Sequence, residues 1–139
     1  NVMSWRGTES GLKAAAEGYD VVMTPKNFCY FNYLQSEDPS TEPFGHGHFL
    51  PLDKVYGYEP FEGLAQGAES HILGVQANMW TEYIGDQNYM EYMLLPRLAA
   101  ISEVQWSSPQ DKDYERFYAS LAGKMYTILD TLGYNYRKY

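Results

Sequence analysis

Three short apolar runs in the sequence are each followed by aromatic and polar side chains of the types that bind ligands. The first run ends at Trp5, the second leads to Tyr30 and Asn32, and the third leads to Trp80 and Glu82. Aromatic rings stack on the apolar C–H face of a sugar ring, and an amide or a carboxylate can hydrogen-bond its hydroxyl groups. Brought together, these residue types would form a carbohydrate-binding pocket.

Each of these residues also has a purely structural interpretation that the sequence leaves open. Trp5 could pack beneath a loop, and Tyr30 could belong to an aromatic core cluster with Tyr33. Glu82 could cap the following helix, because a negative charge is favourable near a helix N-terminus. Their shared location favours a functional interpretation, since the working residues of parallel α/β folds gather just beyond the carboxyl ends of the strands.

Other reactive residues in the sequence do not form a recognisable chemical motif. His46 and His48 are too close together to be a helical pair of metal ligands, so we expect a loop that exposes both imidazoles. The sequence has no glycine-rich phosphate loop, no Gly-x-Ser-x-Gly motif and no Asp-Glu pair at a strand end. We therefore predict neither a metal site nor a cofactor.

The elements that must position the candidate residues can be assigned from the hydrophobic pattern. Strands are predicted at Val2–Trp5, Val21–Thr24 and Ile72–Met79, which are short apolar runs bounded by turn residues. Residues Gly11–Gly18 predict a short helix between the first two strands. A strand, a helix and a strand in so short a stretch predict a right-handed βαβ crossover, and hence parallel strands.

A long connection precedes the third strand. Residues Gln35–Ser70 are rich in proline and glycine, and we expect at most one short helix there, near Phe61–Glu69. Loops of this length in a compact domain are usually functional or disordered. The aromatic residues within the connection favour an ordered loop that packs against the rest of the chain.

Two helical regions are predicted after the third strand. The first begins at about Gln87 with Asp86 as its N-cap, and Pro96 should kink it. The last begins at about Lys112 with Asp111 as its N-cap. The expected order is therefore three βα units of an α/β fold, with a parallel sheet that has two open edges and an uncovered inner face.

Length, charge and composition limit the possible functions. The chain has 139 residues, fewer than the ~250 of a complete (β/α)8 barrel, and it starts inside a predicted strand, so we expect a fragment. Its net charge of −8 argues against nucleic acid and anionic membranes as partners, while a neutral sugar is compatible with it. A single cysteine, Cys29, excludes an intramolecular disulfide, and no stretch is long and apolar enough to span a bilayer.

In this order, these motifs resemble the last third of the catalytic barrel of glycoside hydrolase family 20, the β-N-acetylhexosaminidases. The Trp-x-Glu motif after the third strand is the most specific element, together with the Tyr-x-Asn before it. The resemblance covers nearly the whole chain and is carried by Val2–Gly7, Val22–Pro25, Cys29–Tyr33, Leu50–Tyr56, Ile72–Tyr83, Glu91–Ala100 and Glu103–Trp106. It implies one domain, residues 1–139, made of the sixth to eighth βα units of a TIM (β/α)8 barrel.

The family resemblance also implies a role for each candidate residue. Tyr30 would be the catalytic tyrosine that donates a hydrogen bond to the acetamido oxygen of the substrate. Trp5 and Trp80 would be walls of the pocket, and Glu82 would bind ring hydroxyls distal to the scissile bond. Asn32 stands where the family usually has an aspartate, so it keeps one acceptor, gains a donor and loses the charge, which can change affinity and epimer preference.

The implied reaction is exo-hydrolysis of terminal β-linked GlcNAc or GalNAc with retention of configuration. In this family the acetamido oxygen of the substrate is itself the nucleophile. The general-acid glutamate and an adjacent aspartate belong to the fourth strand and are not in this chain, so we expect the isolated chain to be inactive and to form oligomers. The resemblance also implies an extracytoplasmic location. A non-catalytic carbohydrate-binding domain and a purely structural domain remain alternatives.

Overall fold

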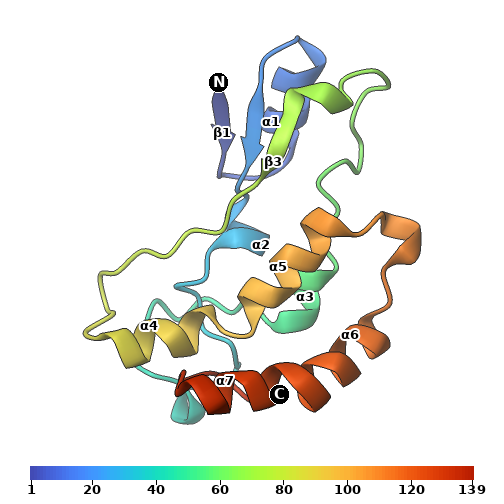
Figure 1. Cartoon of the computed structure of the whole chain (residues 1–139). Coiled ribbons are helices and arrows are strands. Elements are labelled where there is room, and N and C mark those ends of the chain that lie inside the picture. The colour runs from blue at the N-terminus through green and yellow to red at the C-terminus, as the bar shows by residue number, and fades with distance from the viewer.

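A three-stranded parallel sheet forms the upper part of the structure, a computed structural model that describes all residues 1–139 (Figure 1). Its strands are β1 (Val2–Ser4), β2 (Val21–Met23) and β3 (Ile72–Val75), in the order β1-β2-β3. Both strand pairs are parallel, which confirms the predicted arrangement and the α/β class. The central strand β2 has neighbours on both sides, and the side chains of Val21 and Met23 are fully buried.

Helix α1 (Glu9–Ala16) connects β1 to β2 and packs closely against both strands. A Cβ at Gly11 would lie 2.6 Å from the Cβ of Ser4, so only glycine permits this approach. The Ser4 hydroxyl accepts from the Gly11 N–H at 3.0 Å and donates to the Gly7 carbonyl at 2.6 Å. These bonds fix the turn that begins immediately after β1, at Trp5.

The long connection contains a helix at a different place from the predicted one. Helix α3 (Leu52–Tyr56) begins after Pro51, and its buried face consists of Leu52, Val55 and Tyr56. The helix expected near Phe61–Glu69 does not form, because Gly63 and Gly67 adopt positive φ angles of 80° and 87° that a right-handed helix does not allow. Two 3₁₀ turns, Pro39–Thr41 and Glu69–His71, complete the connection.

The helical region after β3 is divided at Pro96, as predicted. Helix α4 (Gln87–Leu94) begins at the predicted cap, where the Asp86 side chain accepts a hydrogen bond of 2.7 Å from the Tyr89 N–H. Helix α5 (Arg97–Trp106) follows the proline and packs against α3 and β3 (Figure 1). The sheet, α3 and α5 enclose the main core, to which the fully buried residues Val21, Met23, Leu52, Val55 and Ala100 belong.

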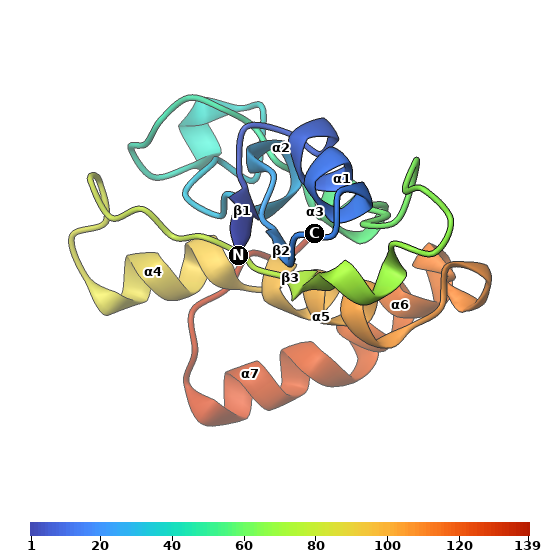
Figure 2. The same ribbon diagram turned by 90° about the horizontal axis from the view of Figure 1, so that it is seen from above.

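The last helical region begins later than predicted. Its N-cap is Asp113, whose side chain accepts from the Arg116 N–H at 3.0 Å, whereas Asp111 lies in a preceding 3₁₀ turn. Helices α6 (Tyr114–Ser120) and α7 (Tyr126–Leu132) are joined by a π-helical turn, and Gly133 ends α7 in a left-handed conformation. Viewed from the sheet, α7 lies beyond α5 (Figure 2). No helix is long and apolar enough to cross a membrane.

A buried polar cluster ties the C-terminal tail to the long connection. The carboxylate of Glu42, whose side chain is 0% exposed, pairs with Arg137. It also accepts hydrogen bonds of 3.0 Å from the Tyr92 hydroxyl and from the Gln35 N–H. The Tyr139 hydroxyl donates to the Gln35 side chain at 2.9 Å. These bonds hold the tail and the start of the connection together.

Candidate functional site

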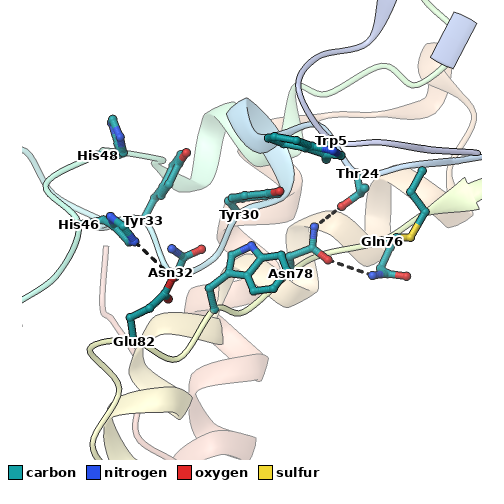
Figure 3. A pocket seen from close by; sticks show the side chains of 12 residues that line it. Trp5, Thr24, Tyr30, Asn32, Tyr33, His46, His48, Gln76, Asn78 and Glu82 are labelled. Atoms are coloured by element: carbon teal, nitrogen blue, oxygen red, sulfur yellow. Dashed lines mark hydrogen bonds and ion pairs between the residues drawn. The ribbon is translucent and has the colours of Figure 1, made fainter. Parts of the chain in front are cut away.

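A single cavity of about 670 Å³ lies beyond the carboxyl ends of the strands and contains all of the predicted site residues (Figure 3). Trp5 follows β1, Tyr30 and Asn32 follow β2, and Trp80 and Glu82 follow β3. The remaining lining residues are Met3, Thr24, Tyr33, His46, His48, Gln76 and Asn78. The structure therefore brings together the three groups that the sequence pattern singled out.

The chain extends the sheet beyond β2 and β3, and this extension forms one wall of the pocket. After the short helix α2 (Lys26–Cys29), Tyr30 forms an isolated parallel bridge with Asn78. The Phe31 N–H donates to the Asn78 carbonyl at 2.8 Å, and the Asn78 N–H donates to the Cys29 carbonyl at 2.7 Å. These bonds place the ring of Tyr30 beside that of Trp80, with centroids 6.1 Å apart.

Side chains on both sides of the Tyr30–Asn78 bridge alternate between the core and the pocket. Cys29 and Phe31 are fully buried in the core, whereas Tyr30 and Asn32 line the pocket. After β3, every second residue lines the pocket: Gln76, Asn78, Trp80 and Glu82. The period of two explains how residues close in sequence serve both the core and the site.

The aromatic walls present open surface. Trp5 and Trp80 are 45% and 51% exposed, so neither is buried under a loop. Arg6 lies over the Trp5 ring, 4.9 Å from its centroid. Tyr30 is half-buried and faces the cavity rather than the core. In this structure Trp5 is not covered by a loop, and Tyr30 borders the cavity while its ring lies 5.8 Å from that of Tyr33.

Polar groups are held in place along the pocket wall. The Asn78 side chain donates to the Thr24 hydroxyl, and Gln76 donates to the Asn78 side chain at 2.9 Å (Figure 3). Asn32 differs, because its residue is only 6% exposed and its Oδ1 atom has no hydrogen-bond partner. A buried carbonyl oxygen without a partner costs about 1–3 kcal/mol. Asn32 is thus an available acceptor at the pocket.

Two histidines that were expected on an exposed loop also line the pocket. His46 Nε2 lies 3.8 Å from Oε1 of Glu82, and the rings of His46 and His48 are stacked with centroids 6.3 Å apart (Figure 3). His48 packs against Tyr33 at 4.8 Å, and His46 against Tyr83 at 5.2 Å. Glu82 is therefore engaged across the pocket, and the cap of α4 is Asp86 instead.

A long-range pairing carries the histidines to the site. The Leu34 N–H donates to the His48 carbonyl at 2.7 Å, and the Leu50 N–H donates to the Leu34 carbonyl at 2.9 Å. These bonds place the loop beside the segment that follows Asn32. No local sequence pattern around His46 or His48 predicts this pairing.

The ionisable groups of the pocket suit binding rather than nucleophilic attack by the protein. Glu82 is the one carboxylate that lines it. Burial, and secondarily the nearby Tyr30, raises the pKa of Tyr33. Burial also raises the pKa of the Cys29 thiol, which lies in the core and not in the pocket, to about 12. Neither group therefore supplies an anion at neutral pH. No group of three His, Cys, Asp or Glu side chains could hold a metal ion.

Comparison with known families and structures relates the chain to glycoside hydrolases. The family model "Glycosyl hydrolase family 20, catalytic domain" matches residues 1–109. A β-hexosaminidase of Porphyromonas gingivalis is 38% identical over 137 residues, which are 97% of this chain and 17% of the relative. A β-N-acetylhexosaminidase of Cellulomonas fimi is 35% identical over 113 residues, 80% of this chain and 22% of the relative.

Solved structures give the same result. An inactive mutant of a GH20 exo-β-N-acetylglucosaminidase from Vibrio harveyi matches 99% of this chain with a TM-score of 0.89 and 36% sequence identity. A GH20 exo-β-N-acetylglucosaminidase from Vibrio harveyi in complex with N-acetylglucosamine matches with a TM-score of 0.84 and 33% identity. In both, the chain covers 22% of the matched structure. The chain thus spans about a fifth of the length of the proteins it is similar to.

Proposed function

The chain belongs to glycoside hydrolase family 20, and on this premise we propose that it is part of an exo-acting β-N-acetylhexosaminidase. The observation that carries the proposal is the convergence of Trp5, Tyr30 and Trp80, from three different strand ends, in one cavity with Asn32 and Glu82. The substrates would be glycans with a terminal β-linked GlcNAc or GalNAc. This chain would supply the sugar pocket, and the general acid would come from another part of the enzyme.

We further propose that β1, β2 and β3 are the sixth, seventh and eighth strands of a (β/α)8 barrel. Their parallel pairing, with α1 and α5 packed against the same small sheet, supports this assignment. The pocket lies beyond the carboxyl ends of the strands, where active sites of such barrels lie. The uncovered edges of β1 and β3 would then pair with the neighbouring strands of the barrel.

The proposed reaction proceeds by substrate assistance. The acetamido oxygen attacks the anomeric carbon as the glycosidic bond breaks, and the leaving oxygen takes a proton from an acid outside this chain. Tyr30 would donate a hydrogen bond to the acetamido oxygen and hold it at the anomeric carbon. The exposed faces of Trp5 and Trp80 are suited to enclose the acetamido group and the sugar ring.

The polar residues of the pocket would form hydrogen bonds with the ring hydroxyls of the sugar. Glu82 can accept two hydrogen bonds, and the unpaired Oδ1 of Asn32 can accept one more from a hydroxyl group. His46, 3.8 Å from Glu82, would hold that carboxylate toward the sugar. Because Asn32 is neutral, the pocket carries one negative charge where the usual aspartate of the family would add a second.

A non-catalytic carbohydrate-binding domain is the second candidate. Glu82 is the one carboxylate in the pocket, and a hydrolase needs a general acid in addition to groups that bind the sugar. A binding domain would use the same aromatic walls and hydrogen-bonding groups. The two candidates therefore differ in turnover and not in the expected position of the sugar.

The test uses the full-length protein that contains this chain, with an aryl β-N-acetylglucosaminide as substrate. Tyr30→Phe should lower kcat by ~10²–10³-fold with a smaller change in KM, because its hydrogen bond strengthens as the acetamido oxygen becomes nucleophilic. Tyr19→Phe, at an exposed tyrosine outside the pocket, is the matched control. A wild-type kcat in Tyr30→Phe would show that Tyr30 only packs or binds, and sugar binding without turnover by the wild type would favour the binding domain.

A further inference from the structure

Arg97, the first residue of α5, lies behind the pocket and is completely buried. All of its hydrogen bonds go to main-chain carbonyl oxygens. Its Nη1 atom donates to the carbonyls of Tyr33 at 2.9 Å and Leu50 at 3.0 Å, and its Nη2 atom donates to that of Phe31 at 2.6 Å. The Met93 carbonyl at the end of α4 accepts from both Nε and Nη2.

The charge of Arg97 is hydrogen-bonded directly by these carbonyl dipoles and not by a carboxylate. None of the ion pairs in the structure includes Arg97. Burial lowers the pKa of its guanidinium to about 10, which still leaves it charged at neutral pH. A buried charge is costly unless its environment is fully hydrogen-bonded. The guanidinium therefore donates hydrogen bonds to buried backbone carbonyl groups rather than forming a stabilising ion pair.

That backbone is the segment that carries the pocket residues. The carbonyls of Phe31 and Tyr33 flank Asn32, and Phe31 also follows Tyr30 directly. Residues 30–33 form a turn, in which the Tyr33 N–H donates to the Tyr30 carbonyl at 3.2 Å, and anchoring the carbonyls of Phe31 and Tyr33 restricts rotation of the residue between them. The guanidinium also lies over the Phe31 ring, 5.0 Å from its centroid. The third anchored carbonyl, at Leu50, belongs to the loop that brings in His48.

We propose that Arg97 is a positioning residue, which keeps Tyr30 and Asn32 directed into the pocket by binding the carbonyl oxygens on the far side of their segment. The proposal rests on the function assigned to Tyr30 above and adds the group that holds it. The rigid planar fork of arginine can bind several carbonyls at once, whereas the ammonium of lysine is a single point charge with three donors. Arg97→Lys should therefore preserve the charge but release part of the segment.

A double-mutant cycle in the full-length enzyme tests this role. Arg97→Lys should lower kcat by about 10-fold or more in the wild-type background and by less than about 2-fold in the Tyr30→Phe background, because a tyrosine without its hydroxyl gains little from being held. The control is Val104→Ala, in the same helix and 7% exposed, which removes core packing but no hydrogen bond to the carbonyls of the segment. Its effect on kcat should be the same in both backgrounds.

The other outcomes are also decisive. Equal effects of Arg97→Lys in both backgrounds would overturn the proposal and leave Arg97 with a role in folding alone. If circular dichroism shows that Arg97→Lys is not folded, Arg97→Gln replaces it, and failure of both to fold overturns the proposal too. If Tyr30→Phe retains the wild-type kcat, the proposed role of Tyr30 is refuted independently of Arg97. The role of Arg97 is then tested by a second double-mutant cycle, which combines Arg97→Lys with Asn32→Ala and compares KM. If the wild type binds sugar without turnover, the same cycles are measured in Kd.

Discussion

Removing the positive charge from the buried cluster around Glu42 should destabilise the fold measurably. In Arg137→Gln, the Glu42 carboxylate, 0% exposed, keeps its hydrogen bonds to Tyr92 and Gln35 but loses its ion pair. Breaking a fully buried pair costs about 3–5 kcal/mol, and breaking an exposed pair costs about 0–1 kcal/mol. Arg137 is 20% exposed and two hydrogen bonds remain, so we expect a loss of about 2 kcal/mol.

Urea unfolding of the 139-residue chain, followed by fluorescence and circular dichroism at one fixed protein concentration, measures this loss. A loss of that size corresponds to a fall of roughly 6–10 °C in Tm. Arg116→Gln is the matched control, because Arg116 is an exposed arginine whose guanidinium binds a backbone carbonyl, and its loss should stay within about 0.5 kcal/mol. Equal small effects of the two substitutions would refute the claim that the tail is anchored through Glu42.

Four further predictions concern the site and the chain. In the full-length enzyme, Glu82→Gln should raise KM several-fold more than it lowers kcat, and a selective loss of kcat in steady-state assays would contradict a role in binding hydroxyls. Because burial raises the pKa of Cys29 from 9.0 to about 12, its contribution to stability should be intact below pH 9 and decline between pH 9 and about 12. For the same reason, a disulfide reagent at pH 8 should label this thiol slowly in the native chain and quickly in the urea-unfolded chain. The 139-residue chain alone should not hydrolyse an aryl β-N-acetylglucosaminide, and turnover abolished by Tyr30→Phe would overturn this. Because β1 and β3 leave open edges, the chain alone should associate, and a monodisperse 16.0 kDa species in light scattering at all concentrations would contradict it.

Local patterns predicted those parts of the structure that depend on local interactions. The strands at Val2 and Val21, the cap at Asp86 and the break at Pro96 follow from backbone chemistry within a few residues. The choice of Asp113 over Asp111 as the last cap does not, because both lie close to the helix start and only the extended backbone of Asp113 presents its carboxylate to the Arg116 N–H. Helix boundaries of this kind depend on how the preceding turn packs.

The candidate site was predictable to the extent that it lies at strand ends. Trp5, Tyr30 and Trp80 could be grouped because parallel strands bring their carboxyl ends to one edge. His46 and His48 could not, since they reach the pocket through the pairing of their loop with Leu34. That pairing is a tertiary contact between two segments that are distant in sequence, and no periodicity within the loop predicts it.

The alternation of side chains along 29–32 and 76–82 has a consequence for how this protein can change through evolution. Substitutions at pocket-facing positions such as Gln76 or Asn78 leave the opposite, core-facing set untouched, so the shape of the pocket can drift while the core is conserved. Insertions and deletions behave differently, because a shift of one residue would displace the fully buried Phe31 from the core and Asn32 from the pocket. These two segments should therefore keep a fixed length among relatives whose specificities differ.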